Sequence, residues 1–262
     1  MKNKEVISHI VNWLKEYSES SRTSGFVIGI SGGIDSALTS TLCAMTGKNV
    51  ICLNMPIHQQ KREYDRGNEH ITWLKEKFKN VSSHEVELTQ PFETLSASFP
   101  ENVRDWLTMA NTRARLRMTT LYAFAGHHKM LVAGTGNKVE DFGIGFFTKY
   151  GDGGVDLSPI ADLIKSEVFA LAAELGILRS IQVAKPTDGL FADDRSDEDQ
   201  IGASYDELEW AMKSLENKND MSGASERERA VMEIYTQRHR ANKHKIDPIP
   251  VCIIPAELKK KL

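Results

Sequence analysis

The segment Phe26-Val27-Ile28-Gly29-Ile30-Ser31-Gly32-Gly33-Ile34-Asp35-Ser36 decides the fold of this 262-residue chain. An apolar, strand-like run stops at a loop of small residues, and a helix-like stretch follows. Glycines let the backbone approach an anion closely, and the start of the next helix offers free N–H groups to it. The segment therefore predicts a phosphate-binding junction between a strand and a helix, where Asp35 adds a carboxylate for a divalent cation.

Two common nucleotide-binding motifs do not fit. A Walker A loop needs G-x-x-x-x-G-K-[ST], but Leu42 stands where the first glycine should precede Gly47-Lys48. The dinucleotide motif G-x-G-x-x-G is absent too, because Gly143-Ile144-Gly145 continues into Phe146-Phe147-Thr148. A plain glycine turn that only joins strand to helix is the remaining alternative, and the flanking pattern disfavours it.

Helical and strand-like patterns alternate along the chain. Helices are predicted over 3–19, 36–46, 63–78, 105–126 and 161–175, and near 205–217 and 225–243. Strands are predicted over 26–30, 49–54, 84–88 and 130–135. This alternation is typical of an α/β fold with a doubly wound, mostly parallel sheet and helices on both faces. Ligands of such a sheet bind at the carboxyl ends of its strands.

Composition narrows the class of protein. Lys+Arg 33 against Asp+Glu 36 gives a net charge of −3, which offers no broad basic field for nucleic acid. The three cysteines are scattered without a C-x-x-C pair and suit a reducing compartment. No run is long enough to span a membrane, and the N-terminus lacks a signal pattern. We expect one cytoplasmic domain over 1–262 that binds neither nucleic acid nor membrane, with a mobile acidic flap over 188–203.

A second group of polar residues follows the predicted strand 130–135. The loop Gly134-Thr135-Gly136-Asn137-Lys138-Val139-Glu140 should emerge beside the first loop. Asp35 and Glu140 are hard oxygen ligands that can share Mg²⁺ with phosphate oxygens, and Thr135 can hydrogen-bond a ribose or a base. A single acid after a strand is more often only a helix N-terminal charge, so Glu140 alone does not decide the function.

The motifs resemble those of a known family. Ser-Gly-Gly-x-Asp-Ser at 31–36 resembles the pyrophosphate loop of the ATP pyrophosphatase superfamily, whose members cleave ATP between the α and β phosphates. The patterns Gly-Thr-Gly-Asn-Lys-x-Glu at 134–140 and Gly-Phe-Phe-Thr-Lys-Tyr-Gly-Asp-Gly-Gly-x-Asp at 145–156 are similar to those of the NAD synthetases. A simple turn explains the glycines of the second pattern but not its aromatic residues and lysine. The resemblance extends to about residue 245 and implies an adenine nucleotide alpha hydrolase-like, Rossmann-like fold.

The resemblance implies an ammonia-dependent ligase. Nicotinic acid adenine dinucleotide (deamido-NAD), ATP and ammonia would give NAD, AMP and pyrophosphate, with Mg²⁺ as the cofactor. The nicotinate carboxylate would attack the α-phosphorus, and ammonia would then displace AMP from the mixed anhydride. Only about 25 residues precede the first loop, so we expect no glutaminase domain ahead of it. Free ammonia or a separate donor protein would supply nitrogen, and a homodimer is also implied.

The family's site residues carry over position by position. The implied ATP-binding residues are Gly29, Ile30, Ser31, Gly32, Gly33, Ile34, Asp35, Ser36, Gln60, Thr135, Lys165 and Thr187. The implied substrate-binding residues are Arg115, Lys149, Asp156, His244 and Lys245. Asp35 and Glu140 are the candidate metal ligands. The candidate catalytic residues are Asp35, Lys149 and Asp152, and Asp152 is a hypothetical acceptor for the proton of ammonium.

Ordinary explanations for several of these residues stay open. Arg115 lies between Arg113 and Arg117, and all three could form a solvated helix face. Lys165 could be a surface lysine, and the basic residues 244–245 could be a solvated tail. Asn54 stands where many relatives carry an arginine, which puts one ATP contact in question, and a second glutamine at 59 leaves the register at Gln60 open.

Two other functions compete with this interpretation. Another ATP pyrophosphatase is possible, such as a GMP-synthetase-like enzyme or a tRNA-thiolating enzyme. Missing thiolation cysteines and the net negative charge argue against tRNA thiolation. A nucleotide-binding module without catalysis is the second alternative, and the presence of both Asp35 and Glu140 argues against it.

Overall fold

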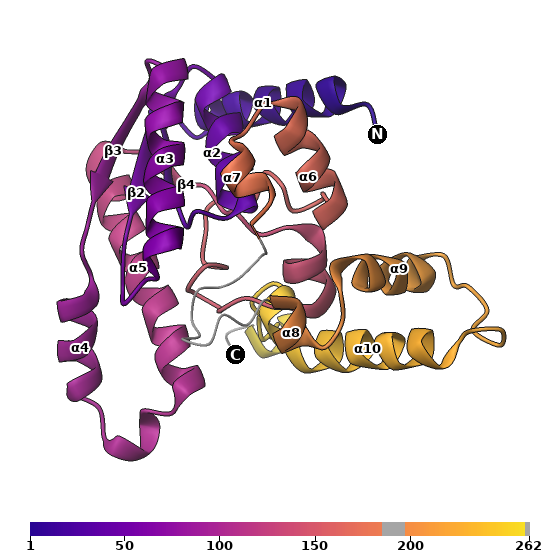
Figure 1. Ribbon diagram of the computed structural model, residues 1–262. Coiled ribbons are helices and arrows are strands. Elements are labelled where there is room, and N and C mark those ends of the chain that lie inside the picture. Colours follow the sequence, from indigo (N-terminus) through magenta and orange to yellow (C-terminus); the bar gives the residue numbers. More distant parts are fainter. Residues whose placement is uncertain (185–196, 260–262) are drawn as a thin grey trace.

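The computed structural model describes residues 1–184 and 197–259. In that part of the chain, one parallel sheet has the strand order β3-β2-β1-β4 (Figure 1). Its strands are β1 (Gly25–Gly29), β2 (Asn49–Asn54), β3 (Val81–Glu85) and β4 (Leu131–Val132). β2 and β3 follow on one side of β1, whereas β4 lies on its other side. The predicted doubly wound sheet is confirmed, and its switch point lies between β1 and β4.

Helices cover both faces of the sheet because successive strand residues point to opposite sides. Phe26 and Ile28 of β1 pack in one buried cluster, and Val27 packs in another. The helices with residues in the first cluster are α1 (Asn3–Ser20), α2 (Ile34–Met45), α3 (Lys61–Lys77), α6 (Lys165–Glu174) and α7 (Arg179–Gln182). Those with residues in the second are α4 (Thr89–Ala97) and α5 (Trp106–His128), joined by the short turn η1 (Glu101–Val103).

A third cluster holds a separate group of helices beside the sheet (Figure 1). We call α8 (Asp197–Ile201), α9 (Tyr205–Glu216) and α10 (Glu226–Ile246) the helical unit. It packs against η2 (Lys138–Ile144), a π-helical segment that follows β4. The unit therefore lies next to the switch point. Of the predicted flap, residues 188–196 lie outside the described residues, and Ile201 in the described part is buried in this cluster.

Three predicted elements need correction. The strand predicted at 84–88 lies at Val81–Glu85, because this edge strand is polar and the alternating Val86 and Leu88 after it drew the prediction too far along. The strand predicted at 130–135 is β4 alone: Ala133 still donates to the Val27 carbonyl of β1 but also forms an isolated bridge with Leu157, and the Gly134 N–H donates to the Leu157 carbonyl. The helix predicted at 161–175 begins only at Lys165. Helices α4, α7 and α8, the π-helical η2 and the short turns η1 and η3 were not predicted.

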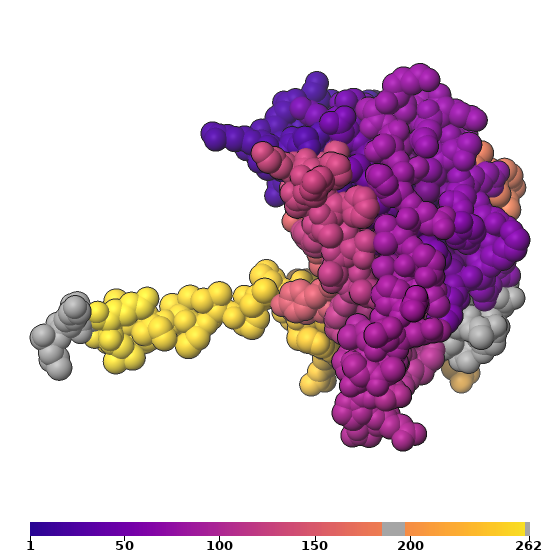
Figure 2. All heavy atoms as spheres, turned by 90° about the vertical axis from the view of Figure 1, so that its left-hand side faces the viewer, coloured from indigo at the N-terminus to yellow at the C-terminus, as the bar shows by residue number. Residues whose placement is uncertain are grey.

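The C-terminal segment after α10 projects away from the body (Figure 2). It is irregular apart from the short turn η3 (Ala256–Lys259), and Val251 and Ile253 are exposed within it. Among the described helices, none is both long and apolar enough to cross a membrane.

A buried histidine makes the stability of the fold depend on pH. His70 of α3 is fully buried, its Nε2 lies 2.9 Å from Ser40 Oγ of α2, and burial lowers its pKa from 6.5 to about 4. Between these values the unfolded chain binds the proton and the folded chain does not, so stability falls as the pH drops from 6.5 to 4. The loss should reach about 3 kcal/mol.

Thermal unfolding between pH 7.5 and 4 measures this effect. His70→Gln should flatten the pH dependence over that range, whereas His9→Gln, which removes an exposed histidine of α1, should leave it as in the wild type. Identical curves for the wild type and His70→Gln would contradict the assignment.

Candidate active site

The predicted phosphate loop, residues 31–36, lies at the carboxyl end of β1. Gly32 has φ +82°, and a Cβ there would lie 2.4 Å from the carbonyl oxygen of Glu63 in α3. The Ser31 and Ser36 hydroxyls lie 3.1 Å apart, and the Gly33 N–H donates to Ser31 Oγ at 3.2 Å. Gly33 is the N-cap of α2 and provides no side-chain cap. The first N–H groups of α2 are thus left for an anion.

Residues at the start of α3 support this loop. Gln59 Nε2 donates to the Ser31 carbonyl at 3.3 Å, and Arg66 Nε donates to the Gly32 carbonyl at 3.2 Å. Gln60, the predicted ATP residue, is the N-cap of α3. The structure thus places Gln59 against the loop. Asn54, at the departure from the family pattern, is buried and donates to Asn68 Oδ1 at 2.9 Å.

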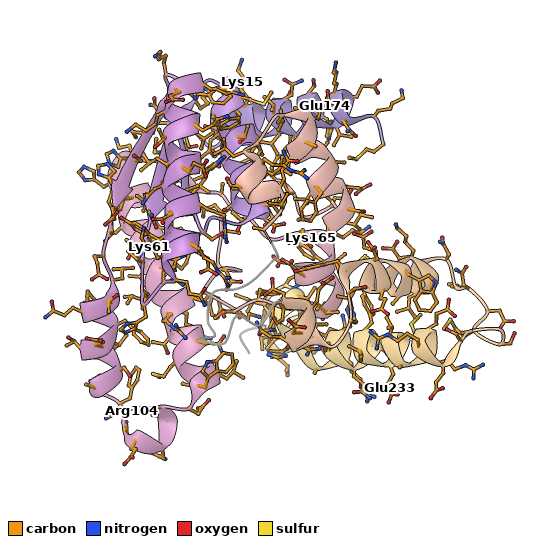
Figure 3. The ribbon with its side chains drawn as sticks, viewed as in Figure 1. Lys15, Lys61, Arg104, Lys165, Glu174 and Glu233 are labelled. Atoms are coloured by element: carbon orange, nitrogen blue, oxygen red, sulfur yellow. The ribbon has the colours of Figure 1, made fainter. Side chains whose placement is uncertain are left out.

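Asp35, Lys165 and Glu140 come together as the charge cluster. Lys165 Nζ lies 2.6 Å from Asp35 Oδ2 and 2.9 Å from Glu140 Oε1. Lys165 is only 2% exposed, so the surface-lysine alternative is wrong. Figure 3 shows it at the start of α6, where α6 meets the helical unit. Asn137 donates to Asp35 Oδ1 at 3.1 Å and accepts the Glu140 N–H at 3.1 Å. The predicted convergence of the two carboxylates is confirmed, with a lysine between them.

The pKa shifts in the charge cluster follow from burial and from opposite charges. Burial acts to lower the pKa of Lys165, but Asp35 and Glu140 outweigh it and raise that pKa well above its usual value. Burial acts to raise the pKa of Glu140, but Lys165 and a hydrogen bond from Tyr205 hold it below its usual value. For Asp35, burial and the nearby Glu140 prevail over Lys165, and the pKa is raised. Lys165 therefore keeps its positive charge at neutral pH.

Tyr205, which the sequence analysis missed, closes the cluster from the helical unit. Its hydroxyl donates to Glu140 Oε1 at 2.5 Å and lies 3.3 Å from Asp197 Oδ2. Lys165 Nζ lies 4.7 Å from the centre of its ring. Burial and the two carboxylates raise the pKa of Tyr205 well above its usual value, so the phenol keeps its proton.

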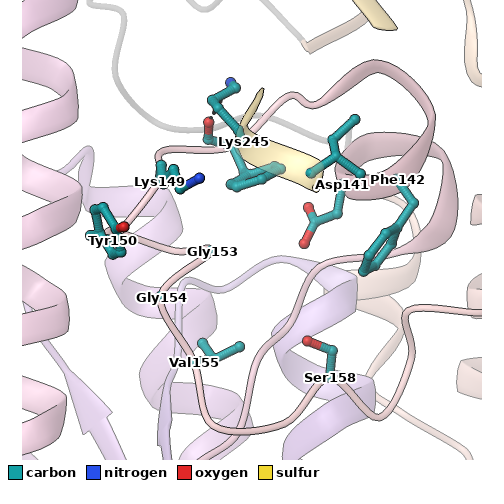
Figure 4. A pocket seen from close by; sticks show the side chains of 11 residues that line it. Asp141, Phe142, Lys149, Tyr150, Gly153, Gly154, Val155, Ser158 and Lys245 are labelled. Atoms are coloured by element: carbon teal, nitrogen blue, oxygen red, sulfur yellow. Dashed lines mark hydrogen bonds between the residues drawn. The ribbon is translucent and has the colours of Figure 1, made fainter. Parts of the chain in front are cut away.

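A pocket of about 360 Å³ is lined in part by Asp141, which follows Glu140 in η2 (Figure 4). Its lining includes Lys149, Tyr150 and Lys245, from the predicted glycine-aromatic loop and from the end of α10. Lys149 Nζ donates to the His244 carbonyl at 2.6 Å, and Lys245 Nζ donates to the Phe147 carbonyl at 2.7 Å. Burial lowers the pKa of Lys245. Lys149 and Lys245, two of the predicted substrate residues, thus line one pocket. The alternative that Lys245 lies in a solvated tail is wrong.

The other predicted substrate residues do not line this pocket. Arg115 is exposed and donates from Nε to the Lys149 carbonyl at 3.2 Å, whereas the neighbouring Arg117 donates inward to the Met55 carbonyl at 3.0 Å. Asp156 accepts the Val132 N–H at 2.8 Å and so secures the edge of β4. The side chain of His244 is exposed.

Two more predicted residues, Asp152 and Thr135, lie in loops at the site. Asp152 Oδ1 accepts the Thr148 N–H at 3.0 Å. Thr135 is half-buried in the loop after β4, and Thr187 lies outside the described residues.

Asp141 is a further side chain that the sequence analysis missed. It lines the pocket, and burial together with Asp152, Glu140 and Asp35 raises its pKa well above the usual value. A Cβ at Gly136 would lie 1.8 Å from Asp141 Oδ2, so this glycine makes room for the carboxylate. Asp141 directly follows Glu140 in the sequence, which was the available clue to it. The inward direction of the Asp141 side chain depends on the π-helical turn of η2.

An uncapped glycine loop at the switch point of a parallel sheet, beside a lysine held between two acids, defines a nucleotide-binding α/β protein that handles phosphate. The sequence matches the family described as NAD synthase over residues 6–249. The chain belongs to this family and is a ligase.

Individual relatives agree with this assignment. The NH(3)-dependent NAD(+) synthetase of Mycoplasma genitalium is 35% identical over 240 residues, which are 90% of this chain and 92% of the relative. A solved NMN synthetase from Francisella tularensis is 30% identical with a TM-score of 0.83, covering 98% of this chain and 99% of that one. A solved NH3-dependent NAD synthetase from Campylobacter jejuni is 26% identical with a TM-score of 0.79, covering 97% and 100%.

Proposed function

We propose that this protein is an ammonia-dependent NAD synthetase, which amidates deamido-NAD and converts ATP to AMP and pyrophosphate. The observation that carries the proposal is the placement of the phosphate loop and the charge cluster at one switch point, next to a pocket lined by two lysines. Family membership supports the reaction type.

The residues of the chain suit the charge changes of this reaction. A carboxylate does not react with ammonia directly, so its oxygen first attacks the α-phosphorus of ATP and expels pyrophosphate. The phosphate loop holds the leaving pyrophosphate by its N–H groups and by the start of α2. Lys165 provides a fixed positive charge beside Asp35 and Glu140. Ammonia then attacks the carbonyl carbon of the mixed anhydride, and AMP leaves.

Several pocket residues receive proposed roles. Lys149 and Lys245 line the pocket and suit an anionic dinucleotide, while Arg115, Asp156 and His244 belong to the surrounding loops and helix ends. Asp152 is proposed to take the proton of ammonium. An amidation rate of Asp152→Asn equal to that of the wild type at every pH would contradict this role.

The donor set fits Mg²⁺. Among residues 1–184 and 197–259, no cluster of three or more His, Cys, Asp or Glu side chains could hold a metal alone. Mg²⁺ commonly binds through one or two carboxylates together with substrate phosphates, and Asp35 and Glu140 provide such a pair beside the phosphate loop. When bound there, Mg²⁺ would neutralise negative charge that develops on the phosphate oxygens.

One observation favours a second substrate. The similar structure from Francisella tularensis is described as an NMN synthetase, and it matches this chain over nearly the full length of both. The mononucleotide analogue, which carries the same nicotinate carboxylate, is therefore the second candidate acceptor.

An acceptor assay decides between these candidates. The protein is mixed with ATP, Mg²⁺ and ammonium, and pyrophosphate and amide product are measured with deamido-NAD, with its mononucleotide analogue, or with no acceptor. We expect the highest kcat/KM with deamido-NAD. A higher kcat/KM with the mononucleotide would transfer the assignment to the second candidate, and ATP cleavage without either acceptor would contradict both.

We also propose a homodimer in the cytoplasm. Apolar side chains are exposed on the projecting tail and on α5, and pairing between two copies would bury them. They are Ile249, Val251, Ile253, Ile254, Leu258, Trp106, Leu107 and Tyr122. Light scattering at micromolar concentration should give twice the mass of the chain, and the mass of a single chain would contradict the proposal.

A further inference from the structure

Tyr205 connects the helical unit to the charge cluster. The charge cluster comes from α2, η2 and α6, whereas Tyr205 is the first residue of α9 in the helical unit. Its hydroxyl donates to Glu140, and its ring lies against the Lys165 ammonium. Tyr205 is therefore a direct contact between the helical unit and the charged side chains of the site.

Local contacts fix the position of Tyr205. Ser204 caps α9 by accepting the Glu207 N–H, and Glu207 in turn accepts the Ser204 N–H at 2.8 Å. The backbone N–H of Tyr205 donates to Glu198 of α8 at 2.8 Å. Tyr205 itself is only 7% exposed. These contacts leave the side chain little freedom to turn away from Glu140.

A second contact from the same helix holds α6. Glu209 of α9 is buried, and its carboxylate accepts the backbone N–H and the hydroxyl of Ser166, both at 2.8 Å. Ser166 directly follows Lys165 at the start of α6. Helix α9 therefore contacts the charge cluster at two neighbouring points.

The Tyr205 hydroxyl binds the oxygen that also accepts from Lys165. Glu140 Oε1 lies 2.5 Å from the phenol and 2.9 Å from Lys165 Nζ, so two donors fix one carboxylate oxygen. Loss of the phenol would remove one of these two donors, so Lys165 would hold Glu140 Oε1 without the second hydrogen bond and the carboxylate would be less firmly oriented. A displaced Glu140 carboxylate would weaken the interactions with the metal ion and the ATP phosphates before it affected the rest of the site.

We infer that Tyr205 is a positioning residue of the reaction, which orients Glu140 and Lys165 toward the phosphates of ATP from the helical unit. The inference deepens the proposed function and depends on it. It concerns the ATP side of the reaction and not the pocket lined by Lys149 and Lys245.

Tyr205→Phe tests the inference because it removes the hydroxyl and keeps the ring. We expect kcat/KM for ATP to fall about tenfold to a hundredfold, as for the loss of a hydrogen bond to a charged group. The Mg²⁺ concentration at half-maximal rate should rise, while KM for deamido-NAD stays within about twofold. Calorimetric titration of the variant protein with ATP in the presence of Mg²⁺, without the acceptor, should show ATP binding weakened by a similar factor.

Tyr235→Phe is the matched control. Tyr235 is buried in the same helical unit, stacks on His239 and makes no described hydrogen bond to the charge cluster. This variant should keep both the ATP and the Mg²⁺ dependence of the wild type. Tyr205→Leu, which also removes the ring over Lys165, should lose more than Tyr205→Phe.

The outcomes separate the inference from the proposed function. Wild-type ATP and Mg²⁺ dependence in Tyr205→Phe would overturn the inference, and so would equal losses for ATP and deamido-NAD together with a lower melting temperature. A wild-type protein that releases no pyrophosphate with either acceptor would contradict the proposed function instead.

Discussion

Lys165→Met is expected to lower kcat by roughly a hundredfold to a thousandfold and to destabilise the protein. Lys165 is the cation between Asp35 and Glu140, and methionine has a similar length without the charge. Removing one partner of a buried ion pair typically costs about 3–5 kcal/mol, because the remaining charges lose their compensation. Loss of one preorganised charge at a transition state costs on the order of a hundredfold to a thousandfold in kcat. Chemical unfolding and single-turnover AMP formation measure the two effects.

The pH dependence of Lys165→Met provides a more specific test. Without the lysine, two neighbouring carboxyls face each other, and their pKa values should lie above those of the unfolded chain. The folded variant then holds more protons than the unfolded chain, so its free energy of unfolding should decrease as the pH rises through these values. Added Mg²⁺ should raise the melting temperature of Lys165→Met more than that of the wild type, because no ammonium competes for the carboxylates.

Lys138→Met serves as the control for the lost charge. Lys138 is about a third exposed, and its Nζ lies 3.3 Å from Glu216 at the surface. Exposed pairs contribute roughly 0–1 kcal/mol, so this variant should stay close to the wild type. If Lys165→Met were as stable and as active as Lys138→Met, the charge cluster would have no role.

Gly32→Ala is expected to remove ATP binding. A Cβ at Gly32 would lie 2.4 Å from the Glu63 carbonyl oxygen, and φ +82° strains any residue with a side chain. Backbone atoms cannot turn aside as a side chain can, so the loop must move away from α3. Calorimetric titration with ATP and Mg²⁺ should show no binding, and the melting temperature should fall.

Gly47→Ala separates the collision from the backbone strain. Gly47 has φ +74°, and an added Cβ would meet no atom within 4 Å. The free energy of unfolding of this variant should fall only by about 1–2 kcal/mol, the cost of the left-handed conformation, and the variant should bind ATP like the wild type. Equal ATP binding by Gly32→Ala and Gly47→Ala would mean that the 31–36 loop does not hold the nucleotide.

The sequence predicted those elements in which local pattern and burial agree. The run 26–30 is apolar because β1 is buried on both faces, and the glycines after it are needed at a close approach to α3. In the edge strand β3 the two did not agree, because only Val81 of its residues is buried and the alternation of apolar and polar residues continued beyond the end of the strand. The π-helical turn of η2 has no simple periodicity that a pattern could detect.

The site was predictable where its residues sit at strand ends and less so where tertiary contacts direct them. Asp35 and Glu140 follow β1 and β4, so the topology alone brings them together. Lys165 and Tyr205 lie at the starts of helices, and no local pattern shows that their side chains turn inward. The choice between Arg115 and Arg117 likewise depends on how α5 is rotated against the sheet.

The most direct test of the central claim follows an oxygen atom. Deamido-NAD labelled with ¹⁸O in its nicotinate carboxylate is converted with ATP, Mg²⁺ and ammonium, and the products are analysed by mass spectrometry. Attack of that carboxylate on the α-phosphorus predicts one ¹⁸O atom in AMP and none in pyrophosphate. Label in pyrophosphate or in inorganic phosphate, or AMP without label, would contradict the account.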